Sequence, residues 1–272
     1  MKSLNGSELA GFIKERQAKQ VRALRQASHV NPKLAIIQTK DDPVINTYVR
    51  LKKQYGADIQ VDVDTYMIPQ QEIVQKLQSL NKDKSVHGII IQLPLDDPSQ
   101  TEEIVNQVAS SKDVDALGDP GRGSWFSPAT PMAIIWLLAG YNVELNGKHI
   151  LLVGRGRLVG APLEKMLLGS GYDVETIDKR VTDLSKHTQN ADVIISATGS
   201  PSVLHANMIK TNTVVVDAGV ASESGKTVGD LDDDVYERDD LTLTPRKGGV
   251  GPLTVCALFD NVIRATRQSL KT

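Results

Sequence analysis

Residues 150–163 read ILLVGRGRLVGAPL, and this stretch decides the fold. An apolar run at 150–153 is followed by three glycines, Gly154, Gly156 and Gly160. With Pro162 two positions later, the order predicts a strand, a tight turn and the start of a helix. Such a turn lets backbone N–H groups approach a pyrophosphate at the positive end of the helix dipole. The spacing G-x-G-x-x-x-G differs from the usual G-x-G-x-x-G, so a turn that binds nothing explains it equally well.

The composition is that of an ordinary globular protein. The chain has 272 residues, 40% of them hydrophobic and 24% charged, with a formal net charge of -2. This length predicts one large domain or two of ordinary size. The balanced charge gives no reason to expect nucleic acid or a membrane as a partner.

Cysteine usage and the N-terminus indicate a cytoplasmic location. Cys256 is the single cysteine, so no intramolecular disulfide forms, and the scattered histidines offer no zinc-type spacing or other metal site. The first 20 residues lack the apolar segment of a signal peptide, and no run approaches the roughly 20 apolar residues of a membrane span.

The first part of the chain alternates between strand and helix patterns. After an amphipathic helix at 7–25, the predicted strands are 33–38, 59–67 and 87–93. Predicted helices lie between and after them, from Asp42-Pro43 to a stop at Gly56, at 69–80 and at 102–108. Three such alternations are typical of an α/β layer.

A second α/β pattern follows a segment rich in Gly, Pro, Ser and Asp at 113–131, the best candidate for a domain crossing. A helix at 132–139 precedes the glycine turn. Further strands are predicted at 173–177, 192–196, 213–218 and 241–243, with helices at 158–168 and near Leu184. The glycine-rich stretch 248–252 leads into a closing helix.

Four polar residues of the first part could converge on one site. Tyr48 and Lys52 are four apart and project from one helix face. Gln92 ends an apolar strand, where open α/β sheets hold ligands, and Asp115 follows in a loop. A lysine beside apolar walls can have a lowered pKa and act as a general acid or base. The alternative is a solvated lysine, a packed tyrosine and an amide that satisfies the strand end.

Nine motifs together resemble those of the bifunctional methylenetetrahydrofolate dehydrogenase/methenyltetrahydrofolate cyclohydrolase family. They are YVRLK at 48–52, GIIIQLPL at 88–95, KDVD at 112–115, PATP at 128–131, GRGRLVGAP at 154–162, ADVIISATGSP at 191–201, VVVDAGV at 214–220, GDL at 229–231 and TPRKGGVGPLTV at 244–255. The resemblance covers nearly the whole chain, and QLPL and GGVGP are its most specific parts.

The resemblance implies two α/β domains around a cleft. The first, at 1–120 with the C-terminal helix at 252–272, is the expected folate-binding catalytic domain. The second, at 121–251, is the expected Rossmann-like NAD(P)-binding domain, through which the family forms homodimers. The implied reactions are oxidation of 5,10-methylenetetrahydrofolate to the 5,10-methenyl form and hydrolysis of that form to 10-formyltetrahydrofolate.

The resemblance also implies roles for individual residues. Lys52 is the acid/base group, Gln92 tunes it, Tyr48 orients the folate, and Asp115 binds the amino-pyrimidine edge of the pterin. The implied substrate contacts are Tyr48, Gln92, Leu93, Pro94, Asp115, Gly249, Val250, Gly251 and Pro252. The implied cofactor contacts are Gly154, Arg155, Gly156, Leu158, Val159, Gly160, Lys179, Arg180, Thr198, Gly199, Val220, Gly251 and Thr254.

The choice between NADP and NAD depends on charge. Arg155, Lys179 and Arg180 could meet a 2′-phosphate, whereas Asp178 stands where an acid would bind a free ribose hydroxyl. Three bases against one acid favour NADP over NAD. The alternative is that Lys179 and Arg180 are solvated turn residues.

The chain departs from the family pattern at several places. Val44 and Ile45 replace a small residue and a serine, and 116–127 is altered and shorter, which changes a wall of the expected folate pocket. Gly156 replaces a common serine. Arg246 and Lys247 replace a commoner Val-Pro and either attract a polyglutamate tail or form a solvent-facing turn.

Two rival functions stay open beside the bifunctional enzyme. One is a dehydrogenase that has lost the cyclohydrolase, against which Lys52 and Gln92 are both in place. The other is a nucleotide-binding regulator without turnover, supported by the altered 44–45 and 116–127 stretches. Formation and hydrolysis of methenyltetrahydrofolate, followed separately by absorbance, discriminate the three.

Overall fold

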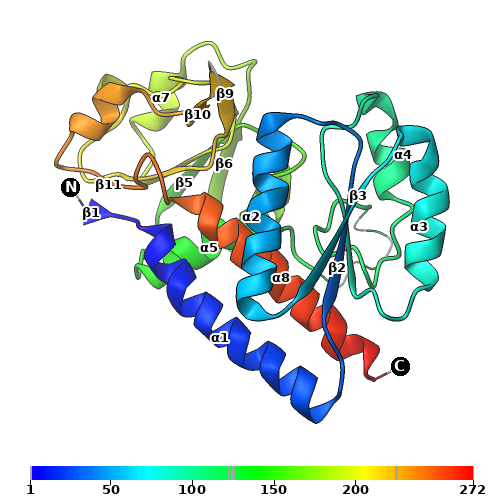
Figure 1. Ribbon diagram of the computed structural model, residues 1–272. Helices are drawn as coiled ribbons and strands as arrows, with labels where there is room; N and C mark the ends of the chain where they lie inside the picture. Colours follow the sequence, from blue (N-terminus) through cyan, green and yellow to red (C-terminus); the bar gives the residue numbers. More distant parts are fainter. Residues whose placement is uncertain (1, 120, 122, 124–125, 224–225, 272) are drawn as a thin grey trace. The chain divides into compact units, whose positions relative to one another are not determined.

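The structure is a computed structural model that describes residues 2–119, 121, 123, 126–223 and 226–271 (Figure 1). The chain divides into two compact units, one of residues 1–10 and 130–254 and the other of residues 11–129 and 255–272. The division expected from sequence differs mainly at the N-terminus, where residues 1–10 join the second α/β pattern rather than the first. The helices α1 (Gly6–Ala27) and α8 (Val250–Ser269) each contribute residues to both units.

The 130–254 unit contains a parallel sheet of six strands in the order β1-β11-β8-β7-β5-β6. Its strands are β1 (Lys2–Ser3), β5 (His149–Val153), β6 (Asp173–Ile177), β7 (Val193–Ser196), β8 (Val214–Asp217) and β11 (Thr242–Leu243). Lys2 pairs with Thr242, which explains why the first residues belong to this unit.

Helices and one hairpin complete the 130–254 unit. They are α5 (Ala129–Gly140), α6 (Gly160–Gly169), α7 (Leu184–Thr188), the 3-10 turns at Ala206–Met208 and Asp233–Glu237, and the antiparallel pair β9 (Ala221–Glu223) and β10 (Lys226–Val228). Apolar side chains of the strands, including Leu151, Ile194 and Val215, are buried together as the core.

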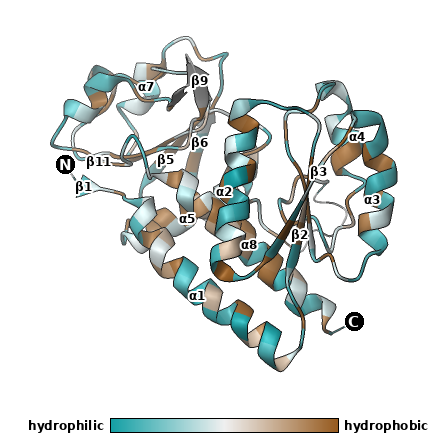
Figure 2. Ribbon diagram, in the orientation of Figure 1, coloured by the Kyte–Doolittle hydropathy of each residue, from teal (hydrophilic) through white to brown (hydrophobic). Residues whose placement is uncertain are grey.

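The 11–129 unit contains a parallel sheet of three strands in the order β3-β2-β4. Its elements are β2 (Lys33–Gln38), α2 (Pro43–Ile59), β3 (Asp62–Met67), a 3-10 turn at Gln70–Glu72, α3 (Ile73–Lys82), β4 (Gly88–Ile91), a 3-10 turn at Pro98–Gln100 and α4 (Thr101–Val105). Hydrophobic and hydrophilic residues alternate along α3 (Figure 2), and its Ile73 and Leu77 are buried against Ile89 and Ile91.

The α/β class and the predicted order of strands and helices are confirmed, with shifts at element ends. The helix α2 does not stop at Gly56 but continues to Ile59, with Gln60 in the left-handed conformation as its cap. A Cβ on Gly56 would lie 2.4 Å from Val63 Cγ2, so glycine at this position of the helix allows it to pack closely against Val63. The stretch 248–252 is likewise not only a loop, because α8 already begins at Val250.

Among the described residues, no helix is both long and apolar enough to cross a membrane. Cys256 is buried, and its sulfur accepts a hydrogen bond of 3.2 Å from the Tyr55 hydroxyl. Of the altered 116–127 segment, Pro120, Arg122, Ser124 and Trp125 lie outside the described residues.

Candidate functional site

The 11–129 unit brings Lys52 and Gln92 into direct contact. Lys52 Nζ donates a hydrogen bond of 2.7 Å to Gln92 Oε1, although the two residues are 40 positions apart. Burial lowers the pKa of Lys52, and the nearby charge of Asp115 opposes that shift. The amine is therefore desolvated, hydrogen-bonded to an amide oxygen and influenced by the charge of the Asp115 carboxylate.

The start of α2 positions Tyr48 and Lys52. Asp42 caps the helix by accepting hydrogen bonds from the backbone N–H of Val44 at 2.8 Å and Ile45 at 3.0 Å, and Pro43 occupies the first turn. Tyr48 lies one turn before Lys52 and is half-buried, which raises the pKa of its phenol. Both side chains thus come from the same helix face, as the four-residue spacing predicts.

The end of β4 fixes Gln92. Its backbone N–H donates to Ile37 O at 2.8 Å, and its side-chain Nε2 donates to Leu93 O at 3.2 Å. The amide nitrogen is therefore occupied and the amide oxygen remains for Lys52. A cis peptide joins Leu93 to Pro94, and Pro94 is exposed.

Asp115 lies within a tight turn, residues 113–118, that the sequence analysis did not assign. The buried side chain of Asp113 accepts hydrogen bonds from Leu117 N at 3.3 Å and Gly118 N at 2.9 Å, and Ala116 adopts a positive φ of 53°. Burial raises the pKa of Asp115, opposed by the charge of Lys52. The repeated D-x-D of 113–115 was a usable signal for this turn, because Asp side chains bond backbone N–H groups a few residues on.

Asn261 of α8 holds both ends of the segment around Asp115. Its Nδ2 donates to Val114 O at 2.8 Å and to Ser127 O at 2.9 Å, and the side chain is buried. Sequence reasoning did not identify Asn261, since it lies 147 residues from Val114.

In the 130–254 unit, two of the three turn glycines are required by the backbone. Gly154 has a positive φ of 102°, and a Cβ there would lie 2.6 Å from Ala197 O. A Cβ on Gly160 would lie 2.0 Å from Gly154 O, so only glycine allows the turn and the start of α6 to pack this closely. Gly156 has no atom within 4 Å of such a Cβ and imposes no comparable constraint. Exposed backbone at the start of a helix fits the pyrophosphate of a dinucleotide.

The other predicted cofactor residues of the turn are largely solvent-facing. Leu158 is 45% exposed, and Val159 is the residue that precedes α6. Arg155 Nε donates to Glu164 Oε2 at 2.8 Å. The negative charge of Glu164 therefore offsets part of the positive charge that the sequence assigned to Arg155. Val220 is 53% exposed at the end of the β8 loop.

The loop of Thr198 and Gly199 is held by a buried carboxylate that the sequence analysis missed. Asp230 accepts hydrogen bonds from Ser196 Oγ at 2.6 Å, Thr198 N at 2.7 Å and Ser200 N at 3.1 Å. A Cβ on Gly219 would lie 1.9 Å from Asp230 Oδ1. Glycine is thus required where this carboxylate packs, and the pair D-A-G at 217–219 with G-D at 229–230 was the available signal.

The 244–254 stretch places the remaining predicted residues. Gly249 and Val250 are buried, Gly251 is exposed and Pro252 is half-buried in the first turn of α8. Thr254 Oγ1 lies 3.4 Å from Thr130 Oγ1. Arg246 forms an ion pair with Asp233 and stacks over the Tyr236 ring.

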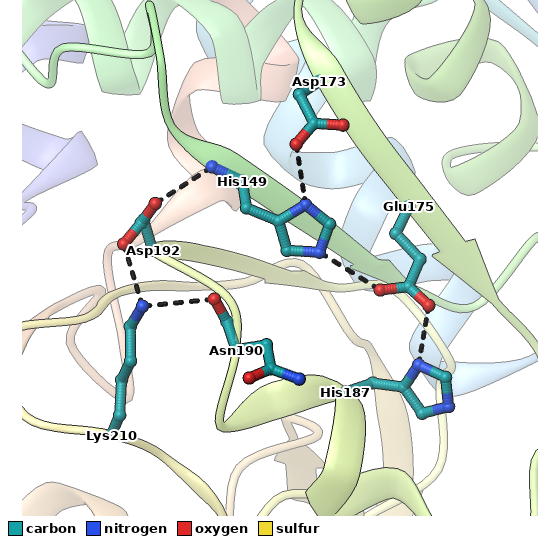
Figure 3. Close-up of polar contacts among 7 residues, drawn as sticks. All are labelled: His149, Asp173, Glu175, His187, Asn190, Asp192 and Lys210. Carbon is teal, nitrogen blue, oxygen red and sulfur yellow. Dashed lines mark hydrogen bonds and ion pairs between the residues drawn. The ribbon is translucent and has the colours of Figure 1, made fainter.

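A separate polar cluster lies at the opposite, amino-terminal ends of the strands (Figure 3). His149 contacts Asp173 through Nδ1 at 2.8 Å and Glu175 through Nε2 at 3.1 Å, while His187 Nδ1 contacts the other oxygen of Glu175 at 2.6 Å. The glycine turn follows the carboxyl end of β5, so this cluster is not part of the nucleotide turn.

These features define a class of protein. A parallel sheet with a constrained glycine turn at its carboxyl end, together with a desolvated amine beside a carboxylate in the other unit, is typical of a nucleotide-dependent α/β enzyme.

Comparisons with known proteins identify the family within this class. Residues 4–115 match the tetrahydrofolate dehydrogenase/cyclohydrolase catalytic domain, and residues 128–270 match the NAD(P)-binding domain of the same family. The chain is 34% identical to the bifunctional protein FolD of Campylobacter jejuni strain RM1221, over 99% of this chain and 100% of that protein.

Two solved structures are similar to this chain over nearly its whole length. The FolD crystal structure from Campylobacter jejuni has a TM-score of 0.92 at 35% identity, covering 98% of this chain and 99% of that one. The Trypanosoma brucei FolD structure, complexed with NADP cofactor and inhibitor, has a TM-score of 0.92 at 26% identity, covering 99% and 98%. The chain belongs to the tetrahydrofolate dehydrogenase/cyclohydrolase family.

Proposed function

We propose that this protein oxidises 5,10-methylenetetrahydrofolate to 5,10-methenyltetrahydrofolate with NADP and hydrolyses the product to 10-formyltetrahydrofolate. The hydrogen bond of 2.7 Å between Lys52 Nζ and Gln92 Oε1 is the observation that carries the proposal. This contact holds the Lys52 amine in place, and burial lowers the pKa of the amine. A larger fraction of the amine is therefore neutral than in water, so that Lys52 can act as the base of the hydrolytic step.

Lys52 handles the water and its protons in this proposal. The neutral amine accepts a proton from the water that adds to the methenyl carbon, and Gln92 keeps the amine directed at that position. One C–N bond of the bridge then breaks. Of the two water protons, one ends on the freed ring nitrogen and the other is released to solvent.

Asp115 and Tyr48 bind the folate. The carboxylate of Asp115 accepts hydrogen bonds from the amino-pyrimidine edge, and Tyr48 packs against the ring system one helical turn before Lys52. Leu93, Pro94 and the stretch Gly249–Pro252 are the further substrate contacts that we propose.

The glycine turn of the 130–254 unit binds the cofactor. Gly154 and Gly160 let the strand end and the start of α6 approach closely, so that backbone N–H groups of the turn can face the pyrophosphate. The basic residues Arg155, Lys179 and Arg180 near this turn favour NADP. When bound, NADP supplies the acceptor for the hydride that leaves the methylene carbon. A homodimer formed through this unit and a cytoplasmic location complete the proposal.

The test compares Lys52→Met with Lys53→Met, since Lys53 is the next residue on α2 and is exposed. Methenyltetrahydrofolate absorbs in the near ultraviolet, so its formation and its hydrolysis are followed separately. We expect Lys52→Met to lose methenyl hydrolysis by about 100-fold or more, the usual worth of general acid–base catalysis, and Lys53→Met to retain it. Undiminished hydrolysis by Lys52→Met would overturn the role of Lys52.

The same assay separates the rival functions. Oxidation without hydrolysis by the unaltered protein would indicate a dehydrogenase alone, which the Lys52–Gln92 pair argues against. Binding of NADP with neither reaction would indicate a nucleotide-binding regulator.

A further inference from the structure

The end of β6 carries an acid directly beside the glycine turn. Gly154 N donates to Ile177 O at 2.8 Å, so the residue after Ile177, Asp178, adjoins the first turn glycine. The neighbouring Arg155 of the turn is paired with Glu164 at 2.8 Å.

An acid at this strand end normally selects NAD. Its carboxylate accepts hydrogen bonds from the ribose hydroxyls, and it repels the 2′-phosphate of NADP. Asp178 therefore works against the choice of NADP unless its carboxylate is otherwise engaged.

Arg180 engages both oxygens of that carboxylate. Its Nε lies 2.9 Å from Oδ1 and 3.1 Å from Oδ2, its Nη2 donates to Oδ2 at 2.7 Å, and its backbone N–H donates to Oδ1 at 3.0 Å. These contacts lower the pKa of Asp178 to about 2, so the carboxylate is ionised and paired. Lys179 lies between the two and is exposed.

We propose that Arg180 is a specificity-determining residue that occupies Asp178 and so withholds it from the ribose of NAD. The inference rests on the proposed function, which places a dinucleotide on this turn. Arg180 acts here by removing an acceptor for NAD, and this differs from a direct contact with the phosphate. The distinction matters because each mechanism predicts a different change in NAD binding.

Calorimetric titration of the full chain with NADP and with NAD tests the inference without relying on turnover. The variants are Arg180→Gln, the neighbouring Lys179→Gln as a matched loss of charge, and the double variant Arg180→Gln/Asp178→Asn. In Arg180→Gln we expect the Kd for NAD to fall about tenfold, because a freed carboxylate makes charge-assisted hydrogen bonds to the ribose. The Kd for NADP should rise by a similar factor through repulsion of the phosphate.

The controls separate the two mechanisms. Lys179→Gln should weaken NADP binding without tightening NAD binding, and the double variant should lose the gain in NAD affinity. Weaker NADP binding by Arg180→Gln with unchanged NAD binding would overturn the inference and indicate a direct phosphate contact. A gain for NAD that survives Asp178→Asn would overturn it as well.

Failure of the proposed function has a different signature. If the unaltered protein binds NAD more tightly than NADP, the proposed cofactor is wrong, yet tightening of NAD binding by Arg180→Gln would still support the inference. If neither dinucleotide binds to any variant, both are overturned.

Discussion

Replacing Asn261 by leucine should destabilise the protein and disturb the segment that carries Asp115. Asn261 is 4% exposed and donates from one nitrogen to two backbone carbonyls, those of Val114 and Ser127. Leucine has the same number and branching of side-chain heavy atoms but no donor, so both carbonyls lose their partner.

The magnitude follows from the burial of the two carbonyls. An unsatisfied buried acceptor costs about 1–3 kcal/mol. Val114 is fully buried, whereas Ser127 is half-buried and its carbonyl can regain water in part. We therefore expect a loss of about 3 kcal/mol in the free energy of unfolding, or a fall in Tm of about 5–6 °C for a chain of this size.

Thermal unfolding followed by circular dichroism measures the effect, with Asp260→Asn on the same helix as the control. We expect that control to change stability by less than about 0.5 kcal/mol, as most substitutions away from such contacts do. A second measurement is the KM for the folate substrate, which should rise in Asn261→Leu because the neighbour of Asp115 is released. If Asn261→Leu melts within a degree of the unaltered protein, the two hydrogen bonds of Asn261 contribute little to stability and the prediction is refuted.

Two further predictions concern stability. Ala116 has a positive φ of 53°, so Ala116→Gly should stabilise the protein by about 0.5 kcal/mol. Ala23→Gly on the exposed face of α1 is the control and should destabilise it by about 1 kcal/mol. Denaturant titration measures both changes, and a loss of stability in Ala116→Gly would show that the Ala116 backbone is not strained. Hydrogen bonding to Asp173 and Glu175 raises the pKa of His149 above its ordinary value, so its contribution is complete below about pH 6.5 and is lost as pH rises through the higher folded pKa. Unfolding at pH 6 and pH 9 should therefore show a loss of about 0.5 kcal/mol that is absent in His149→Gln, and equal losses in the two proteins would argue against this linkage.

The fold was largely predictable because its signals are local. The apolar run KLAIIQ at 33–38 and the strand–turn–helix pattern of 150–163 can be recognised within a few residues, and the Asp42 cap was readable directly. Element ends were less predictable. Nothing in the helix pattern indicates that Gly56 packs against Val63, and β1 has two residues, too few to show a period.

The site was predictable only in part. The proximity of Lys52 and Gln92 follows from family resemblance, since 40 residues separate them and no spacing rule joins them. Asp230, Asn261 and Glu164 escaped prediction because each acts through a contact made in the folded chain. Their types are common at surfaces, and only burial distinguishes Asp230 and Asn261 from solvated residues.

The pKa of the Lys52 ammonium, measured by nitrogen-detected NMR titration, tests the central claim most directly. We expect a pKa below the ordinary 10.5, and a still lower pKa in Asp115→Asn, because the carboxylate stabilises the charged amine. A Lys52 that titrates at or above 10.5, together with an unchanged value in Asp115→Asn, would contradict the claim that this amine is desolvated beside a carboxylate.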